Sequence, residues 1–255
     1  MACFPMRPGK KTDQGYQLPI ASLVCNFPEP SEDQPSLLSH GQVETLFHEF
    51  GHVLHNILYN SDLASQSILS VKRDFVEAPS QIFENWTWEY DALKLFAKHY
   101  ETGEVLPKAL YDKMLAAKNV NSGLSAQTQI FLGMYDFTLH DKYSDNGDFN
   151  TDQVAFELSR EVMTVPRAIE GTHFQAAFGH LNGYGASYYG YLWSLVYAQD
   201  MYSVFEENGP MDRESGERYA NIILANGSSK EEIDLVREFL KREPNNEAFI
   251  RSLGL

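Results

Sequence analysis

The chain has 255 residues, of which 43% are hydrophobic, so it can bury a large core as one domain or as a domain with lobes. Its formal net charge of −15 argues against nucleic acid as a partner, because a phosphate backbone would be repelled. The two cysteines are too few for a disulfide framework, and neither a signal-peptide pattern nor an apolar run of about 18 residues occurs, so we expect no membrane partner and a cytoplasmic location.

The first predicted element is a strand over residues 18–27, with Pro19 near its start. A helix follows it closely along the chain. Ser39 and Gln42 have the spacing of a capping box, and the apolar residues after them recur with helical period. They form one broad stripe: Val43, Leu46, Phe47, Phe50, Val53, Leu54, Ile57 and Leu58. We therefore expect this face of the helix to pack, and the opposite face, which also carries His55, to look into a cleft.

The cleft-facing side of this helix carries an H-E-x-x-H motif, His48-Glu49-Phe50-Gly51-His52. Residues four apart advance about 6 Å and nearly one turn, so His48 and His52 project on the same side and can reach one metal ion. In zinc peptidases such a motif supplies two imidazole ligands and a carboxylate that takes a proton from water. The competing interpretation is that the two histidines are ordinary surface residues of an amphipathic helix.

The third ligand has to come from elsewhere in the chain. The longer pattern H-E-x-x-H-x-x-G-x-x-H would supply a third histidine, but this chain has His55 and Leu58 where that pattern requires glycine and histidine. A glutamate from a second helix remains. Glu77, at the start of the next predicted helical segment, is the best candidate, and Glu84, two turns further on, is the competitor. Residue chemistry alone does not separate them.

The rest of the chain is predicted to be mainly helical. Helices are expected over residues 79–100, 107–119, 124–143, 151–163, 186–205 and 230–242. Tyr184, Tyr188 and Tyr191 are spaced i, i+4 and i+7, so they would form a single stripe if this stretch were helical. The alternative is that these aromatic residues simply belong to the core. The predicted fold class is mainly α with a small β-sheet.

Three strings, in this order along the chain, resemble motifs of the thimet oligopeptidase family of zinc metallopeptidases, which includes neurolysin, oligopeptidase A and mitochondrial intermediate peptidase. They are FHEFGHV at 47–53, DFVEAPSQ at 74–81 with ENW at 84–86, and YYGYLW at 188–193. The resemblance runs from Cys3 to the C-terminal Leu255. It implies a zincin-like catalytic domain that binds one Zn²⁺ through His48, His52 and Glu77, with Glu49 as the general base.

The resemblance also implies roles for the loop and helix around the tyrosines. Tyr191 matches a family tyrosine whose hydroxyl stabilises the oxyanion, and a phenol aimed at a developing alkoxide can lower the barrier by several kcal/mol. His180, Tyr184 and Tyr188 match positions that contact substrate or support the transition state. Gly183 lies in the same loop, which we expect to bind substrate and to adjust to different peptides.

Family members are considerably longer, with two mainly helical domains around a deep channel. The resemblance therefore makes residues 1–255 the C-terminal catalytic portion, either a fragment or a short form of a longer two-domain oligopeptidase. If the missing N-terminal lobe forms the opposite wall, the channel is incomplete here, and an organellar address could also have been removed. In the family an edge strand pairs with the substrate backbone, and residues 18–27 are the candidate for this β-addition.

The predicted function is that of a zinc-dependent endopeptidase acting on short peptides. The alternative is a zinc-loaded peptide-binding domain that is inactive without its missing N-terminal lobe. A third interpretation, a purely structural zinc ion, is disfavoured because two histidines and one glutamate leave a fourth position open, whereas structural sites close with four protein ligands.

Overall fold

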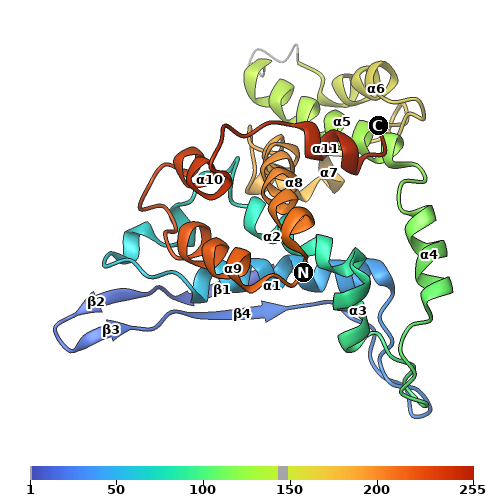
Figure 1. Cartoon of the computed structure of the whole chain (residues 1–255). Helices are drawn as coiled ribbons and strands as arrows, with labels where there is room; N and C mark the ends of the chain where they lie inside the picture. Colours follow the sequence, from blue (N-terminus) through green and yellow to red (C-terminus); the bar gives the residue numbers. More distant parts are fainter. Residues whose placement is uncertain (1, 143–148) are drawn as a thin grey trace. The chain divides into compact units, whose positions relative to one another are not determined.

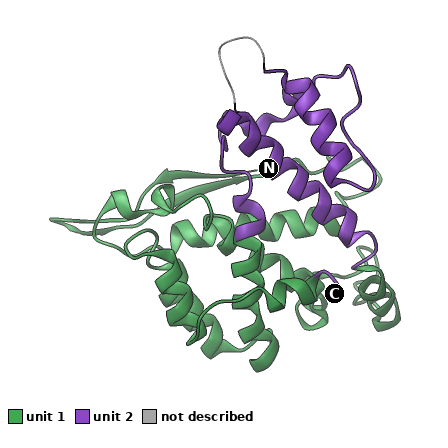
Figure 2. Ribbon diagram, turned by 90° about the horizontal axis from the view of Figure 1, so that it is seen from above, with its two compact units in different colours: residues 1–118, 194–252 green, residues 119–193, 253–255 purple. Residues whose placement is uncertain are grey.

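The computed structural model describes residues 2–142 and 149–255, and Figure 1 shows the elements in chain order. Tyr143, the last residue of the helix predicted over 124–143, lies outside the described residues. The chain divides into two compact units, Met1–Lys118 with Ser194–Ser252 and Asn119–Trp193 with Leu253–Leu255 (Figure 2). We call them unit 1 and unit 2.

Unit 1 begins with four short strands: β1 (Ala2–Arg7), β2 (Lys10–Thr12), β3 (Gly15–Gln17) and β4 (Ile20–Val24). β1 pairs antiparallel with β4, with Cys3 opposite Leu23, and β2 pairs antiparallel with β3. The strand predicted over 18–27 is confirmed in its central residues. It begins after Pro19, which has no N–H to donate to a ladder. The sequence did not reveal β1 to β3, because Pro5 interrupts the first and the hairpin strands are too short to show an alternating pattern.

Most of unit 1 is helical. Its helices are α1 (His40–Ile57), α2 (Ala78–Glu84), α3 (Tyr90–Phe96), α4 (Lys108–Ala117), α9 (Arg213–Tyr219), α10 (Glu232–Leu240) and α11 (Glu247–Ser252), with short 3₁₀ turns at Ala64–Gln66, Ile68–Ser70 and Asn85–Trp88 and a π-helical turn at Ala220–Leu224. The capping box predicted for α1 is present: Ser39 accepts from the Gln42 backbone, and the Gln42 side chain accepts from the Ser39 N–H. The end of α8 (Gly190–Asn208), from Ser194 onward, also belongs to unit 1.

The single helix predicted over 79–100 is wrong, because α2 and α3 are separated by the 3₁₀ turn Asn85–Trp88. The Asn85 side chain donates to the carbonyl oxygen of Ile82 at 3.0 Å, and the Thr87 hydroxyl donates to that of Glu84 at 2.7 Å. Such local bonds compete with helical hydrogen bonding. Glu89 is extended, so the chain leaves the turn in a new direction before α3 starts.

Unit 2 contains α5 (Ser122–Lys142), α6 (Thr151–Val162), α7 (Phe174–Ala177), the 3₁₀ turn Gly179–Asn182 and the first turn of α8. The helix predicted from residue 186 starts four residues later, at Gly190. Ala186 has φ of 57°, a left-handed conformation that cannot continue a right-handed helix. The three tyrosines therefore do not form a single helical stripe, since Tyr184 and Tyr188 precede α8.

Each unit has its own apolar core. In unit 1 the core gathers α2, α8, α10 and the π-helical turn around side chains such as Ile82, Met201, Ile223 and Phe239, all fully buried. In unit 2 it gathers around Phe131 and Tyr135 of α5. The predicted class, mainly helical with small sheets, is confirmed. None of the described helices combines the length and apolar character needed to cross a membrane.

Candidate metal centre and tyrosine cluster

The two histidines of the H-E-x-x-H motif lie side by side on α1. Their ring centroids are 5.1 Å apart, and their side chains are 19% and 15% exposed, so both are largely shielded but reachable. The apolar stripe predicted for the other side of α1 packs in part against α2, where Leu54 and Phe83 join the unit 1 core. The helical spacing of His48 and His52 thus produces the expected common face.

A glycine inside the motif sets how closely α2 approaches α1. A Cβ atom on Gly51 would lie 2.6 Å from the Cα of Ser80 and 2.7 Å from the carbonyl oxygen of Pro79. No side chain fits at that distance, so only glycine allows this approach. Glycine inside a helix is unfavourable and therefore signals a packing requirement. Gly51 was not singled out in the sequence, although it bears directly on the position of the third ligand.

Glu77 occupies the cap position at the start of α2 and is 3% exposed. Its Oε2 lies 3.3 Å from Nε2 of His48 and 3.0 Å from Nε2 of His52. The Ser80 hydroxyl donates to the Glu77 carbonyl oxygen at 2.8 Å, which secures the start of the helix. The structure therefore brings Glu77, and not Glu84, to the two histidine nitrogens that face one another.

Glu84 has a different place at the site. Its Oε1 lies 2.6 Å from Nδ1 of His48, on the side of the ring away from Glu77. A carboxylate at the second ring nitrogen fixes the orientation of a ligand imidazole and its tautomer. Glu44 lies one turn before His48 on α1, and its carboxylate accepts a hydrogen bond from the indole N–H of Trp88 at 2.9 Å.

The electrostatics of this cluster favour positive charge between the imidazoles and Glu77. Burial alone would lower the pKa of His48, but hydrogen bonds to Glu77 and Glu84 outweigh it and raise that pKa to about 10. Burial alone would raise the pKa of Glu77, but hydrogen bonds from His48 and His52 hold it well below its usual range. A divalent cation supplies the same compensation, so metal and proton compete for this place.

The donor set fits a zinc ion. One ligand atom from each of His48, His52 and Glu77 lies within 4.8 Å of the others, and no second group of this kind occurs among the described residues. Donor atoms at about 2.0 to 2.1 Å from a tetrahedral ion lie about 3.3 Å apart, close to the separations at Glu77 Oε2. Three ligands from two helices leave the fourth position for water or substrate.

Glu49 follows His48 on α1 and is 8% exposed. α1 packs against β1 and β4, and the negative charge of Glu49 affects the pKa values of two cysteine thiols, one in β1 and one just after β4. Burial, and then the charge of Glu49, raises the pKa of the Cys3 thiol to about 11. Glu49 also contributes to the raised pKa of Cys25, after burial. The predicted base therefore lies close enough to β1 and β4 to influence their charges, and β4 lies within the segment 18–27 that was predicted to meet the substrate backbone.

In unit 2 the structure gathers His180, Tyr184, Tyr188 and Tyr191, which we call the tyrosine cluster. The His180 ring centroid lies 5.1 Å from that of Tyr188 and 5.6 Å from that of Tyr191. The Tyr184 and Tyr191 rings stack at 5.2 Å. Gly183 ends the 3₁₀ turn that carries His180. The residues that the resemblance grouped by sequence thus also meet in space within this unit.

Tyr188 is the most buried member of the tyrosine cluster, at 7% exposure, and its hydroxyl donates to Oε1 of Gln129 at 3.1 Å. Burial raises the pKa of this phenol. Gln129 on α5 was not singled out in the sequence, because a single glutamine in a helix carries no pattern. The contact ties the cluster to α5.

Comparison with known proteins agrees with this site. The model of peptidase family M3 matches residues 1–255. The chain is 44% identical over 249 residues to oligopeptidase A of Salmonella typhimurium, covering 96% of the chain and 36% of that protein. It is 43% identical to oligopeptidase A of Escherichia coli over the same shares. It is 38% identical over 258 residues to thimet-like oligopeptidase of Dictyostelium discoideum, covering 100% of the chain and 38% of that protein.

The chain thus spans little more than a third of the length of the curated relatives it matches. The match nevertheless extends over the whole chain and includes His48, His52 and Glu77, the group that could hold a metal ion. The helix with two histidines, the glutamate from a second helix and the family match agree with one another. The chain belongs to peptidase family M3, a family of metallopeptidases.

Proposed function

We propose that this chain is the catalytic region of a zinc-dependent oligopeptidase that hydrolyses short peptides. The convergence of the two Nε2 atoms and Glu77 Oε2 within 3.0 to 3.3 Å carries the proposal. Two imidazoles and one carboxylate with an open position are the ligand set of hydrolytic zinc, whereas structural zinc sites close with four protein ligands. The names of the relatives support oligopeptides as the substrate class.

In this proposal the protein residues move protons and orient the peptide. Bound zinc would lower the pKa of a water molecule and polarise the scissile carbonyl. Glu49 takes the proton from the attacking water and returns it to the leaving amine. Tyr191 donates its hydroxyl hydrogen to the oxygen that gains negative charge. His180 supports the transition state beside Tyr191. Gly183, Tyr184 and Tyr188 bind the substrate, and the edge of β4 pairs with its backbone.

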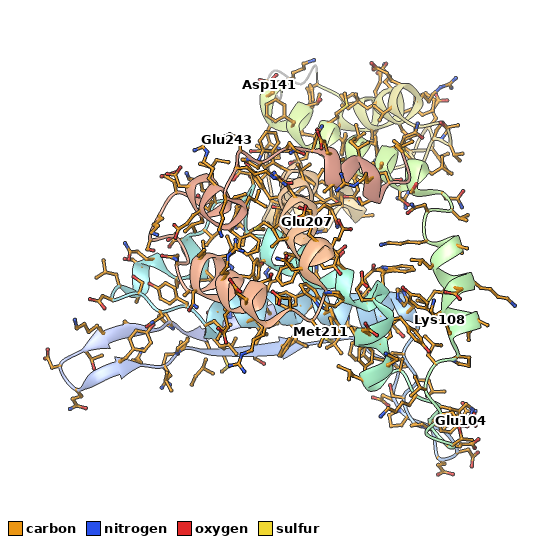
Figure 3. All side chains as sticks on the ribbon, in the orientation of Figure 1. Glu104, Lys108, Asp141, Glu207, Met211 and Glu243 are labelled. Atoms are coloured by element: carbon orange, nitrogen blue, oxygen red, sulfur yellow. The ribbon has the colours of Figure 1, made fainter. Side chains whose placement is uncertain are left out.

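A peptide-cleavage assay with a matched pair of glutamate variants tests the proposal. The purified chain is incubated with a quenched fluorescent peptide, with and without a chelator, and zinc is then restored. Glu49→Gln should lower kcat by about 100- to 10,000-fold while zinc stays bound, because the general base is lost. Glu104→Gln, at an exposed carboxylate labelled in Figure 3, should cleave like the wild type. Full activity in Glu49→Gln, or cleavage that the chelator leaves intact, refutes the mechanism.

A second candidate function has one observation in its favour. Unit 1 carries a groove of about 580 Å³ with an almost wholly apolar lining. Phe50, Leu95 and Met211, the last labelled in Figure 3, contribute to it and are 47%, 65% and 58% exposed. Apolar side chains exposed together along one groove are a feature of interfaces that a partner segment covers. The polypeptide that relatives carry outside the matched region would cover it, and this chain alone would then bind zinc and peptide without turnover.

A chimera separates the two candidates. The chain is joined to the remaining part of Escherichia coli oligopeptidase A, in place of the region that it matches. If the second candidate is right, the isolated chain binds a labelled peptide but does not cleave it, and the chimera does both. Similar turnover by the isolated chain and the chimera excludes it.

A further inference from the structure

One buried carboxylate of α5 holds the loop that carries the tyrosine cluster. Asp136 is 1% exposed. Its Oδ1 accepts the backbone N–H of Ala186 at 3.0 Å, and its Oδ2 accepts that of Tyr188 at 2.9 Å. Both donors belong to residues 183–189, the loop between the 3₁₀ turn and α8, which we call the tyrosine loop. A single side chain therefore fixes this loop at two points.

The loop needs such an anchor because its backbone is strained. Ala186 adopts φ of 57°, which is costly for a residue with a Cβ atom and persists only where the surroundings impose it. The turn that contains Ala186 closes through the Ser187 N–H, which donates to the Tyr184 carbonyl oxygen at 2.8 Å. The two bonds to Asp136 bracket Ser187 and hold the chain in this shape. Hydrogen bonds to a buried charge are among the stronger ones in proteins.

His140, one turn after Asp136 on α5, supports the anchor. Its Nδ1 lies 2.8 Å from the Asp136 carbonyl oxygen and 3.0 Å from Oδ1, and the Ala186 N–H lies within hydrogen-bond distance of the same nitrogen, at 3.2 Å. With hydrogen on Nδ1 the ring donates to Asp136, and with hydrogen on Nε2 it accepts from the loop N–H of Ala186. On the other side of the ring, Nε2 lies 2.6 Å from where a Cβ atom on Gly185 would be. The imidazole is thus wedged against the loop backbone, and only glycine at 185 leaves room for it.

The position of the loop determines the position of the rings. Tyr188 contacts His180 and Tyr191 at 5.1 Å and 5.0 Å between centroids, and its own N–H is one of the two groups held by Asp136. α8 starts directly after the loop, where the Gly190 N–H donates to the Ser187 carbonyl oxygen. Release of the loop would therefore move Tyr184 and Tyr188 away from Tyr191.

We propose that Asp136, supported by His140, is the positioning residue of the tyrosine loop and holds it in the shape in which Tyr184 and Tyr188 receive a peptide. The role assigned to these tyrosines rests on the proposed function. Asp136 acts through the loop backbone and does not touch the substrate. Its contribution is preorganisation: the ordering of the loop is completed before the peptide binds.

Hydrogen–deuterium exchange of the tyrosine loop tests the anchor directly. In Asp136→Asn the shape is kept, but an amide N–H₂ replaces one of the two acceptor oxygens, so the N–H of Ala186 or of Tyr188 loses its acceptor on residue 136. The matched control is Asp200→Asn, because Asp200 is also 1% exposed and accepts from Arg242 and from the Asn245 N–H, all three in unit 1. Exchange over 183–189 should rise about tenfold or more in Asp136→Asn and stay unchanged in Asp200→Asn. Equal exchange in both variants overturns the anchor.

A glycine pair tests the same anchor without altering the carboxylate. Gly185→Ala places a methyl group against the His140 ring, whereas a Cβ atom on Gly179 meets nothing within 4 Å. Gly185→Ala should speed loop exchange in the same way as Asp136→Asn, and Gly179→Ala should leave it unchanged. If Gly185→Ala leaves the exchange of the loop unchanged, the wedge formed by His140 is refuted.

Peptide affinity and kcat of the same variants test the positioning role. With zinc content unchanged, Asp136→Asn should bind the quenched peptide about tenfold more weakly, and any cleavage should slow, whereas Asp200→Asn should match the wild type. A loosened loop with full affinity and full kcat overturns the positioning role. If the wild-type chain neither binds nor cleaves peptide, the proposed function fails, and the exchange data still decide whether Asp136 anchors the loop.

Discussion

The metal centre of unit 1 and the tyrosine cluster of unit 2 are assembled in different ways. At the metal centre, side chains converge from two regular helices, and the approach of those helices at Gly51 sets the distances. In the cluster, Tyr184 and Tyr188 lie on an irregular loop, and backbone hydrogen bonds to Asp136 set their place. A helix-borne site is expected to fail by loss of a ligand or of packing, and a loop-borne site by release of the backbone.

The largest effect on zinc binding is expected at Glu77, the proposed ligand that α2 brings to the two histidines of α1. Glu77→Gln replaces a charged oxygen ligand with a neutral amide, so zinc should no longer be retained after dialysis, as measured by elemental analysis. Glu84→Gln is the matched comparison, because the Glu84 carboxylate contacts the outer nitrogen of His48 and not the one beside Glu77. It should lower zinc affinity by only about 10- to 100-fold. A larger loss in Glu84→Gln than in Glu77→Gln would reverse the ligand assignment.

The next largest effect is expected in the tyrosine cluster, where a substitution should lower kcat without changing zinc binding at the metal centre. Tyr191→Phe should lower kcat by about 100-fold or more while zinc content and peptide affinity stay nearly constant, because the hydroxyl acts on charge that develops in the transition state. Tyr189→Phe is the control: Tyr189 is 44% exposed and packs beside Trp193. An unchanged kcat in Tyr191→Phe removes this residue from the mechanism.

Two glycines in α1 test whether the close packing of α2 on α1 requires a residue without a side chain. Gly51→Ala forces a methyl group against the backbone of α2 and should lower the free energy of unfolding by about 1 to 3 kcal/mol, with a loss of zinc affinity as Glu77 shifts. Gly41→Ala lies in the same helix with no atom within 4 Å of the new Cβ atom, so it should be neutral or slightly stabilising. Urea unfolding and zinc titration of both variants measure the difference. Equal stability of the two would show that α2 is not held at this distance.

The smallest effect concerns His55, which shares a helix with the ligands but is fully buried rather than facing a cleft. Burial, and then the charge of His52, lowers the pKa of His55 from 6.5 to about 3. A base with a lower pKa in the folded state takes up its proton preferentially in the unfolded state, so its contribution to stability is present above about pH 6.5 and is lost as the pH falls. Between pH 7 and pH 5 the loss is about 2 kcal/mol.

Urea unfolding at pH 7 and pH 5 in the presence of a chelator measures this loss. His55→Leu should flatten the acid side of the stability profile, whereas His99→Gln, at an exposed histidine, should keep the wild-type slope. If His55→Leu loses as much stability between the two pH values as the wild type, His55 is not the group responsible.

Local sequence patterns predicted those structural features that are set by residues close together in the chain. The spacing of His48 and His52, the capping box at Ser39 and the start of a helix just after Glu77 follow from helical period and end signals, and all are confirmed. The break between α2 and α3 was missed, because the side-chain bonds of Asn85 and Thr87 end the regular helix without glycine or proline. The start of α8 was misplaced, because the left-handed Ala186 depends on Asp136, fifty residues earlier.

The sequence by itself determined that the two histidines of the motif share one face of a helix, and it limited the predicted third ligand to Glu77 or Glu84. Only the tertiary structure decided between them, because the distance from each carboxylate to the histidines depends on how closely α2 packs on Gly51. It alone also revealed Asp136, since a single aspartate on a helix has no pattern until the loop that it binds has folded against it. Periodicity is a property of neighbours along the chain, whereas contacts between distant segments form only when the core is built.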